Sequence, residues 1–332
     1  MFENLIEVLK ANPRKIVYTE GTDARILESA ARLKKDGFLT PVLVGNVDDV
    51  RAAAAKGGFD IDGLEILDPA TYPGMDEMVK TMFELRKGKM TEEDCRANLQ
   101  KGNYFGTMLV KMGVADALLG GATYSTADTV RPALQIVKTM KGANLVSSCF
   151  IMVRGDEMLA MGDCAINISY EDKKDKEGNV TLTAAAQLAE VAVATAKTAK
   201  VFGMDPKVAM LSYSTKGSGK GANVDLVREA TAIAKEMAPD VAIDGEMQFD
   251  AAVSPVVGQL KFPGSKVAGY ANTFIFPEIQ SGNIGYKIAQ RLGGFAAYGP
   301  ILQGLNAPIN DLSRGCDAEE VYQMSIITAA LV

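Results

Sequence analysis

The chain has 332 residues, of which 48% are hydrophobic and 23% charged, and its net charge is −6 at pH 7. These values are ordinary for a globular protein, and at about 100–200 residues per domain the length predicts two domains. A negative net charge argues against general nucleic-acid binding, which needs a basic surface. An anionic substrate must therefore be held by local cations or backbone amides.

The sequence contains no histidine. This excludes Ser–His–Asp triads, Cys–His dyads and histidine metal ligands, so a general base must be Asp, Glu, Lys, Tyr or Cys. The four cysteines, Cys95, Cys149, Cys164 and Cys316, form no C-x-x-C pair. Their scatter predicts neither a disulfide framework nor a metal site. We expect a reduced, cytoplasmic protein, without a membrane span or a signal peptide.

In the first part of the chain, short apolar runs alternate with amphipathic segments. The expected strands are residues 15–18, 40–44, 64–67 and 115–119. The expected helices are residues 23–35, 48–56, three within 75–112, and 129–139. Such alternation predicts mostly parallel sheets with right-handed crossovers.

The second part begins with an expected antiparallel hairpin, residues 145–153 and 158–161, joined at Arg154-Gly155-Asp156. A charged loop follows at 170–180. Further helices are expected at 182–198, 223–237 and 318–331, with strands at 208–213, 241–244 and 273–276. We expect the chain to change domain at the hairpin, which gives one α/β domain from 1–148 plus 298–332 and a second from 149–297.

Three loops carry candidate chemistry. Residues 120–132 follow a strand and open a helix, where free amides, hydroxyls and Arg131 suit an oxyanion. Residues 212–221 resemble a phosphate cradle but do not have the spacing of a P-loop. Residues 310–322 combine a serine, an arginine and several carboxylates at the start of the last helix.

Each of these features also has a purely structural interpretation. The spacing of Asp317 and Glu320 is typical of a capping box, in which Glu320 would only stabilise the helix start. Cys164 and Cys316 are more typical of small buried residues than of nucleophiles, because no histidine is available to activate a thiol.

Several motifs together resemble those of the phosphate acetyltransferases. The likeness runs from about residue 15 to the C-terminus. Its segments are 19–25 (TEGTDAR), the Arg131 loop, 162–167 (GDCAIN), 210–217 (MLSYSTKG), 244–250 (DGEMQFD), 283–287 (NIGYK), 299–304 (GPILQG) and 310–316 (NDLSRGC).

The resemblance implies two α/β domains with mostly parallel sheets, of the isocitrate/isopropylmalate dehydrogenase-like kind. It places the active site in the interdomain cleft and implies a homodimer. The reaction is reversible acetyl transfer between acetyl phosphate and coenzyme A, with inorganic phosphate as the other product. Coenzyme A is a substrate, and no cofactor or metal is expected.

The resemblance also assigns roles to residues. Glu320 matches the carboxylate that accepts the thiol proton, with Glu319 as an alternative, although many relatives carry Asp there. Ser313 matches the donor to the carbonyl oxygen, and Arg314 the arginine that holds phosphate. Further substrate contacts are Arg86, Arg131, Ser125, Thr129 and Tyr298. Expected contacts to the coenzyme A phosphates are Lys216, Lys220 and Lys287.

Three other interpretations remain at this point. A phosphate butyryltransferase is the nearest sibling, although residues 310–315 look more like the acetyl branch. A non-catalytic domain that binds acetyl-coenzyme A as a signal is disfavoured by the Ser313-Arg314 pair. An NAD-dependent decarboxylating dehydrogenase would need an aspartate cluster for its metal, and the sequence has no cluster resembling one.

Overall fold

The computed structural model describes residues 2–332, and the backbone contacts divide the chain into two units. Unit 1 comprises Met1–Gly142 and Leu305–Val332, and unit 2 comprises Ala143–Gly304. The chain leaves unit 1 just before the predicted hairpin. It returns later than the expected residue 298, because strand β12 continues to Gln303 and pairs with β5 inside unit 2.

Unit 1 contains a five-stranded parallel sheet with the order β13-β4-β1-β2-β3. Its strands are β1 (Arg14–Tyr18), β2 (Leu39–Val44), β3 (Glu65–Leu67), β4 (Ala117–Gly120) and β13 (Ile309–Asp311). Every pairing is parallel, so the carboxyl ends of these strands lie along one edge. Ligands of such sheets bind at that edge.

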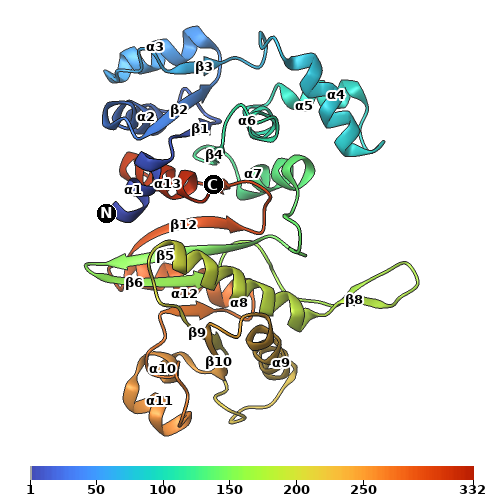
Figure 1. Cartoon of the computed structure of the whole chain (residues 1–332), viewed down its shortest axis with the longest axis vertical. Helices are drawn as coiled ribbons and strands as arrows, with labels where there is room; N and C mark the ends of the chain where they lie inside the picture. The colour runs from blue at the N-terminus through green and yellow to red at the C-terminus, as the bar shows by residue number, and fades with distance from the viewer. Residues whose placement is uncertain (1) are drawn as a thin grey trace. The chain divides into compact units, whose positions relative to one another are not determined.

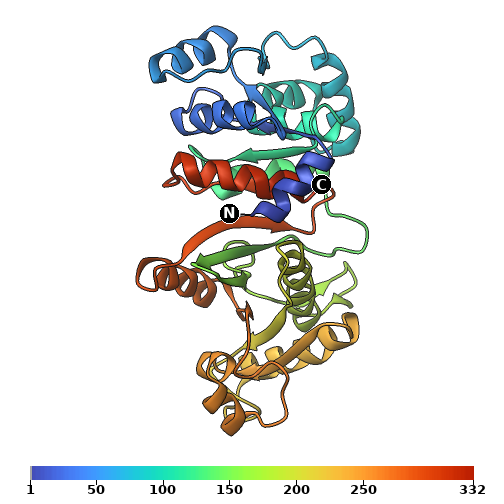
Figure 2. The ribbon, with the colours of Figure 1, turned by 60° about the vertical axis from the view of Figure 1, so that its left-hand side comes forward.

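Helices cover both faces of this sheet (Figure 1). They are α1 (Glu3–Ala11), α2 (Ala24–Asp36), α3 (Val47–Gly57), α4 (Met75–Arg86), α5 (Glu92–Leu99), α6 (Gly102–Lys111), α7 (Thr126–Pro132), the π-helical turn η1 (Ala133–Val137) and α13 (Ala318–Ala330). The last helix packs against α2, and α1 lies beside it, as Figure 2 also shows. On the other side, α6 packs on β1 and β4 and contacts α5, α7 and η1.

Unit 2 contains a six-stranded mixed sheet with the order β10-β9-β11-β6-β5-β12. The strands are β5 (Ser147–Arg154), β6 (Glu157–Gly162), β9 (Lys207–Leu211), β10 (Ala242–Met247), β11 (Thr273–Ile275) and β12 (Ala296–Gln303). The predicted hairpin is confirmed, since β5 and β6 pair antiparallel, and β12 pairs antiparallel with β5. The pairings of β6, β11, β9 and β10 are parallel.

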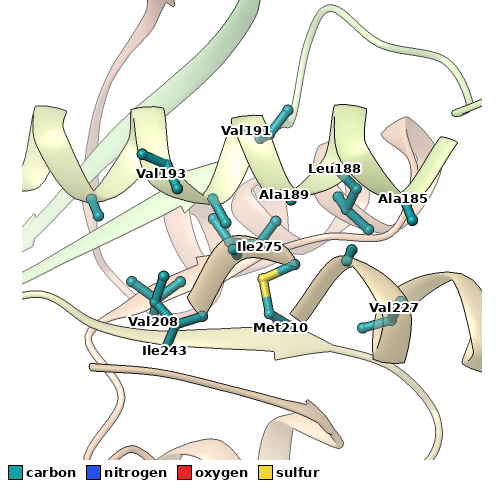
Figure 3. Packing of buried hydrophobic residues seen from close by; sticks show 14 of the residues in the cluster. Ala185, Leu188, Ala189, Val191, Val193, Val208, Met210, Val227, Ile243 and Ile275 are labelled. Carbon is teal, nitrogen blue, oxygen red and sulfur yellow. The ribbon is translucent and has the colours of Figure 1, made fainter. Parts of the chain in front are cut away.

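The helices of unit 2 are α8 (Ala184–Val201), α9 (Ala222–Met237), α10 (Phe249–Val253), α11 (Pro255–Lys261) and α12 (Ile279–Arg291). The predicted charged loop contains a small hairpin, β7 (Lys173–Lys174) with β8 (Val180–Leu182). Alanines let α8 approach the sheet closely, and its Leu188 lies in the same buried cluster as Val208 and Met210 of β9 (Figure 3). The two units thus confirm two α/β domains with mostly parallel sheets.

None of the helices within residues 2–332 is long and apolar enough to cross a membrane.

Candidate functional site

The loop after β13 forms a tight turn at residues 313–316. The Cys316 amide donates to the Ser313 carbonyl at 3.0 Å, and the Gly315 amide donates to Ser313 Oγ at 3.2 Å. Ser313 and Arg314 are both exposed. The turn therefore presents a hydroxyl donor and a planar cation on adjacent residues. An acyl phosphate needs this pair, one group for its carbonyl oxygen and one for its phosphoryl oxygens.

Helix α13 starts directly after this turn. Asp317 is its N-cap residue, and its Oδ1 accepts from the Glu320 amide at 2.8 Å. This bond is the half of the predicted capping box that Asp317 makes. Burial raises the pKa of the Cys316 thiol to about 11. The positive charge of Arg25 opposes this rise, whereas the negative charge of Glu320 adds to it.

The neighbouring carboxylate, Glu319, is committed elsewhere. It accepts from Gln323 Nε2 at 2.6 Å and pairs with Arg32. The hydrogen bond from Gln323, followed by the bond and charge of Arg32, lowers the pKa of Glu319. A carboxylate with a lowered pKa is a weaker base, and this counts against Glu319 as a proton acceptor.

A buried carboxylate that sequence reasoning missed connects the two loops of unit 1. Asp311, at the end of β13, is 2% exposed and accepts from Thr126 Oγ1 at 2.6 Å and Thr129 Oγ1 at 2.5 Å. Burial raises its pKa to about 6. A Cβ on Gly121 would come within 2.2 Å of Asp311 Oδ1. A glycine directly after β4, at position 121, thus leaves room for this carboxylate to reach α7.

Helix α7 carries three of the predicted substrate residues. Ser125 Oγ donates to Asp128 Oδ2 at 2.7 Å, and the exposed Arg131 lies 3.9 Å from Asp128 Oδ1. Thr129 differs from the expected lining hydroxyl, because it is 2% exposed and its hydroxyl is bound by Asp311. Thr129 therefore anchors α7, and its role as a substrate contact stays a prediction.

Arg86 and Arg131 act on the same neighbour. Burial raises the pKa of the Tyr104 hydroxyl, and the positive charges of Arg131 and Arg86 oppose that rise. Arg86 is the last residue of α4 and is partly buried. Its Nε atom is buried and has no hydrogen-bond partner among the described residues. An arginine with an unused donor suits a phosphate group.

The TEGTDAR segment holds a loop in place. Glu20 accepts from the Gly121 amide at 3.1 Å and from the Thr123 amide at 2.7 Å, and burial raises its pKa. Glu20 also lines a hollow of about 640 Å³ with Asp23 and Asp68. The residues that line this hollow include no lysine or arginine. It therefore suits a phosphate less well than the surface near Arg86 and Arg131.

In unit 2, the loop at 212–221 is not the open phosphate cradle that its composition suggested. The Gly217 amide donates to Glu246 Oε1 at 2.7 Å, and Ser214 Oγ donates to the same oxygen at 2.9 Å. The Gly219 amide donates to Ser214 Oγ. Because the buried Glu246 carboxylate and the Ser214 hydroxyl already occupy these donors, the backbone of the loop has little left to offer a phosphate.

The three predicted lysines are all exposed, and they do not share one hollow. Lys216 lies 4.9 Å from the centre of the Phe262 ring and lines a hollow of about 520 Å³. Lys220 lies in the same loop as Lys216, whereas Lys287 lies on α12. Contacts of these lysines to coenzyme A stay predictions.

Tyr298 was expected in the first domain, but it belongs to unit 2. It lies in β12, opposite Ile151 of β5, and is 7% exposed. The correction has the same cause as the shifted boundary, namely the pairing of β12 with β5.

We expect that no cysteine is essential. Cys164 and Cys316 are 0% and 5% exposed, and burial raises the pKa of both thiols, so both are neutral at pH 7. Cys164→Ala and Cys316→Ala, singly and combined, should keep initial rates within about tenfold, unlike loss of a covalent nucleophile. An acetylated cysteine found by mass spectrometry, or ping-pong kinetics, would contradict this expectation.

Known proteins resemble this chain over nearly its full length. The sequence profile of the phosphate acetyl/butaryl transferase family matches residues 1–329. A phosphate acetyltransferase from Bacillus subtilis strain 168 is 51% identical over 330 residues, 99% of this chain and 98% of the relative. A phosphotransacetylase structure from Streptococcus pyogenes has a TM-score of 0.92 at 53% identity, covering 99% of this chain and 97% of its own. One from Staphylococcus aureus has a TM-score of 0.86 at 50% identity, covering 99% and 98%.

The fold and the site thus define an acyltransferase with a paired serine and arginine beside a helix-borne carboxylate. The chain belongs to the phosphate acetyl/butaryl transferase family.

Proposed function

We propose that this chain transfers an acetyl group reversibly between acetyl phosphate and coenzyme A. The observation that carries the proposal is the exposed Ser313-Arg314 turn directly before Glu320, in a chain that is 51–53% identical to phosphate acetyltransferases over nearly its full length. Family membership alone leaves the acyl chain open, and these relatives favour acetyl over butyryl.

The proposed chemistry is direct transfer in a ternary complex. A free thiol has a pKa near 8.5, so only a few per cent of coenzyme A is thiolate at pH 7. Glu320 accepts the thiol proton while the sulfur attacks the carbonyl carbon. Ser313 Oγ donates to the carbonyl oxygen as negative charge develops there. The sulfur–carbon bond forms and the carbon–oxygen bond to phosphate breaks. The proton taken up by Glu320 passes to the departing phosphate, which leaves as HPO4²⁻ and is held by Arg314.

The remaining predicted residues bind rather than react. Arg86 and Arg131 are proposed to hold phosphoryl groups, which the unused Nε of Arg86 supports. Ser125, Thr129 and Tyr298 are proposed to shape the substrate surface, Thr129 through Asp311. Lys216, Lys220 and Lys287 are proposed contacts for the phosphates of coenzyme A.

The test is an assay of thioester formation with purified protein, acetyl phosphate and coenzyme A. The product is detected by its ultraviolet absorbance. We expect acetyl-coenzyme A to form at the same rate before and after dialysis against EDTA. Among residues 2–332 no group of three or more Cys, Asp or Glu side chains could hold a metal. Binding of acetyl-coenzyme A without turnover would instead favour the regulatory domain. Loss of turnover that Mg²⁺ or Zn²⁺ restores would contradict metal independence.

The proposed assembly is a cytoplasmic homodimer. Helix α12 exposes Ile284, Ile288 and Leu292 at 58%, 53% and 85%, one apolar stripe at helical spacing. A large exposed apolar patch commonly marks a protein interface. We propose that a second copy of the chain covers this apolar stripe. Sedimentation velocity tests the proposal, because it distinguishes the mass of one chain from the mass of two.

A further inference from the structure

Arg25 lies at the start of α2 and uses its whole guanidinium group inside unit 1. An arginine side chain has five N–H donors. Nε and Nη2 donate to the two carboxylate oxygens of Asp23 at 2.9 and 2.8 Å. Nη2 also donates to the Ala122 carbonyl at 2.9 Å. Nη1 donates to the carbonyls of Arg314 and Cys316 at 2.9 and 3.1 Å. Each donor therefore already has an acceptor, and none remains for a substrate.

These bonds join three segments that are far apart in the sequence. Asp23 caps α2, and Ala122 lies in the loop between β4 and α7. The carbonyls of Arg314 and Cys316 belong to the turn at residues 313–316. The β4–α7 loop leads into the helix of Arg131, and the turn carries Ser313. One guanidinium thus fixes the spacing of the two loops to which substrate contacts are assigned.

Helix stability does not explain a cation at this position. A positive charge in the first turn of a helix is unfavourable, because the helix dipole places partial positive charge there. Asp23 offsets that cost, and its hydrogen bonds with Arg25 raise the pKa of the guanidinium above its ordinary value. A lysine would keep the charge but could not span this set of acceptors, because it lacks the planar fork.

We propose that Arg25 is a positioning residue for acetyl transfer, which holds the Ser313–Cys316 turn against the β4–α7 loop so that Ser313 Oγ points at the reacting carbonyl. This inference rests on the proposed function. It assigns Arg25 no contact with substrate, in contrast to Arg314, whose side chain is exposed.

The first test compares Arg25→Lys with Arg154→Lys by steady-state kinetics. Arg154 is a matched control in unit 2, since it also donates to a carboxylate and a backbone carbonyl, those of Glu157 and Gly293. Because small misplacements of reacting groups cost up to about 10²-fold, we expect Arg25→Lys to lower kcat by about 10–10²-fold. The KM values for both substrates should stay within about threefold of wild type, and Arg154→Lys should be silent.

The second test asks whether Arg25 acts through Ser313. Removing an oxyanion donor costs about 10²–10³-fold in kcat, so Ser313→Ala gives a background in which orientation of the hydroxyl no longer matters. We expect Arg25→Lys to cost less than about threefold in that background, because residues that act as a unit are not additive. An equal loss in both backgrounds would show a general structural role and overturn the proposal.

Asp23→Asn keeps the experiment decisive if Arg25→Lys fails to fold. Asparagine is a good N-cap residue, but it replaces one of the two Asp23 oxygens that accept from the guanidinium. We therefore expect kcat to fall while KM stays unchanged. Wild-type kcat in a folded Asp23→Asn or Arg25→Lys protein would refute the inference. Absence of acetyl-coenzyme A formation by the wild type would instead refute the proposed function. A silent Ser313→Ala would also refute the inference, because Arg25 is proposed to act through the Ser313 hydroxyl.

Discussion

Glu320→Gln is expected to lower turnover by about 10²–10⁴-fold, the usual loss for a general base. Glutamine keeps the shape of the side chain but cannot accept the thiol proton. The bond from the Glu320 amide to Asp317 Oδ1 is made by the backbone and survives the change. The melting temperature should therefore stay close to that of the wild type while kcat collapses.

Two further variants separate the neighbouring carboxylates. Glu320→Asp should retain much of the activity, because it keeps the functional group. Glu319→Gln should change stability more than rate, since Glu319 is bound by Gln323 and Arg32. If Glu320→Gln stayed within a few-fold of wild type while Glu319→Gln was inactive, the base would be Glu319. Activity of both would place the base elsewhere.

Arg314→Lys is expected to lower kcat/KM for acetyl phosphate by about 10–10²-fold, the worth of one charge-assisted hydrogen bond. Lysine keeps the positive charge but loses the two-pronged geometry. The turn itself should persist, because Arg25 binds the backbone carbonyl of Arg314 and not its side chain.

The measurement for Arg314→Lys is a full matrix of rates against both substrates. The loss should fall mainly on acetyl phosphate, and the KM for coenzyme A should change little. Equal losses for the two substrates would show that Arg314 is not a dedicated phosphate ligand. Circular dichroism and a melting curve serve as the folding control.

Periodicity predicted most of the first half of the fold. The strand expected at 15–18 is β1, the helix expected at 23–35 is α2, and the segment 75–112 contains α4, α5 and α6. These elements have regular patterns of burial and clear caps, such as Asp23 for α2 and Thr91 for α5. Local sequence is sufficient where cap and pattern agree.

The elements that sequence reasoning missed have weak local signals. Strand β12 contains Gly299-Pro300, a pair that argues against a strand. The strand tolerates this pair because β12 lies at the edge of the sheet and its register with β5 shifts at these residues. Helix α12 contains Gly282, where a Cβ would come within 2.7 Å of the Asp163 carbonyl. Glycine lowers helix propensity, and at this position it allows the helix to contact the backbone of Asp163 closely. The helix expected at 129–139 starts earlier and changes to a π-helical turn after Pro132.

The candidate site was predictable only in part. Resemblance supplied Glu320, Ser313 and Arg314, whereas spacing alone would have made Glu320 a cap. Asp311 and Arg25 stood in quoted motifs without a role. Apart from Asp23, which lies two residues before Arg25, their partners are separated from them by more than 90 residues. Long-range hydrogen bonds leave no periodic mark in a sequence, and only the folded chain reveals them.

The discontinuity of unit 1 has a consequence for how the chain is made. Strand β13 pairs with β4, and α13 packs on α2, yet both late elements leave the ribosome after all of unit 2. Since domains fold as they emerge, unit 1 waits without its edge strand until Ile309–Asp311 has been synthesised. A ribosome that stops before residue 309 releases a product that lacks Ser313, Arg314 and Glu320 together with the strand that orders them. If these residues have the roles proposed above, we expect such truncated products to be inactive.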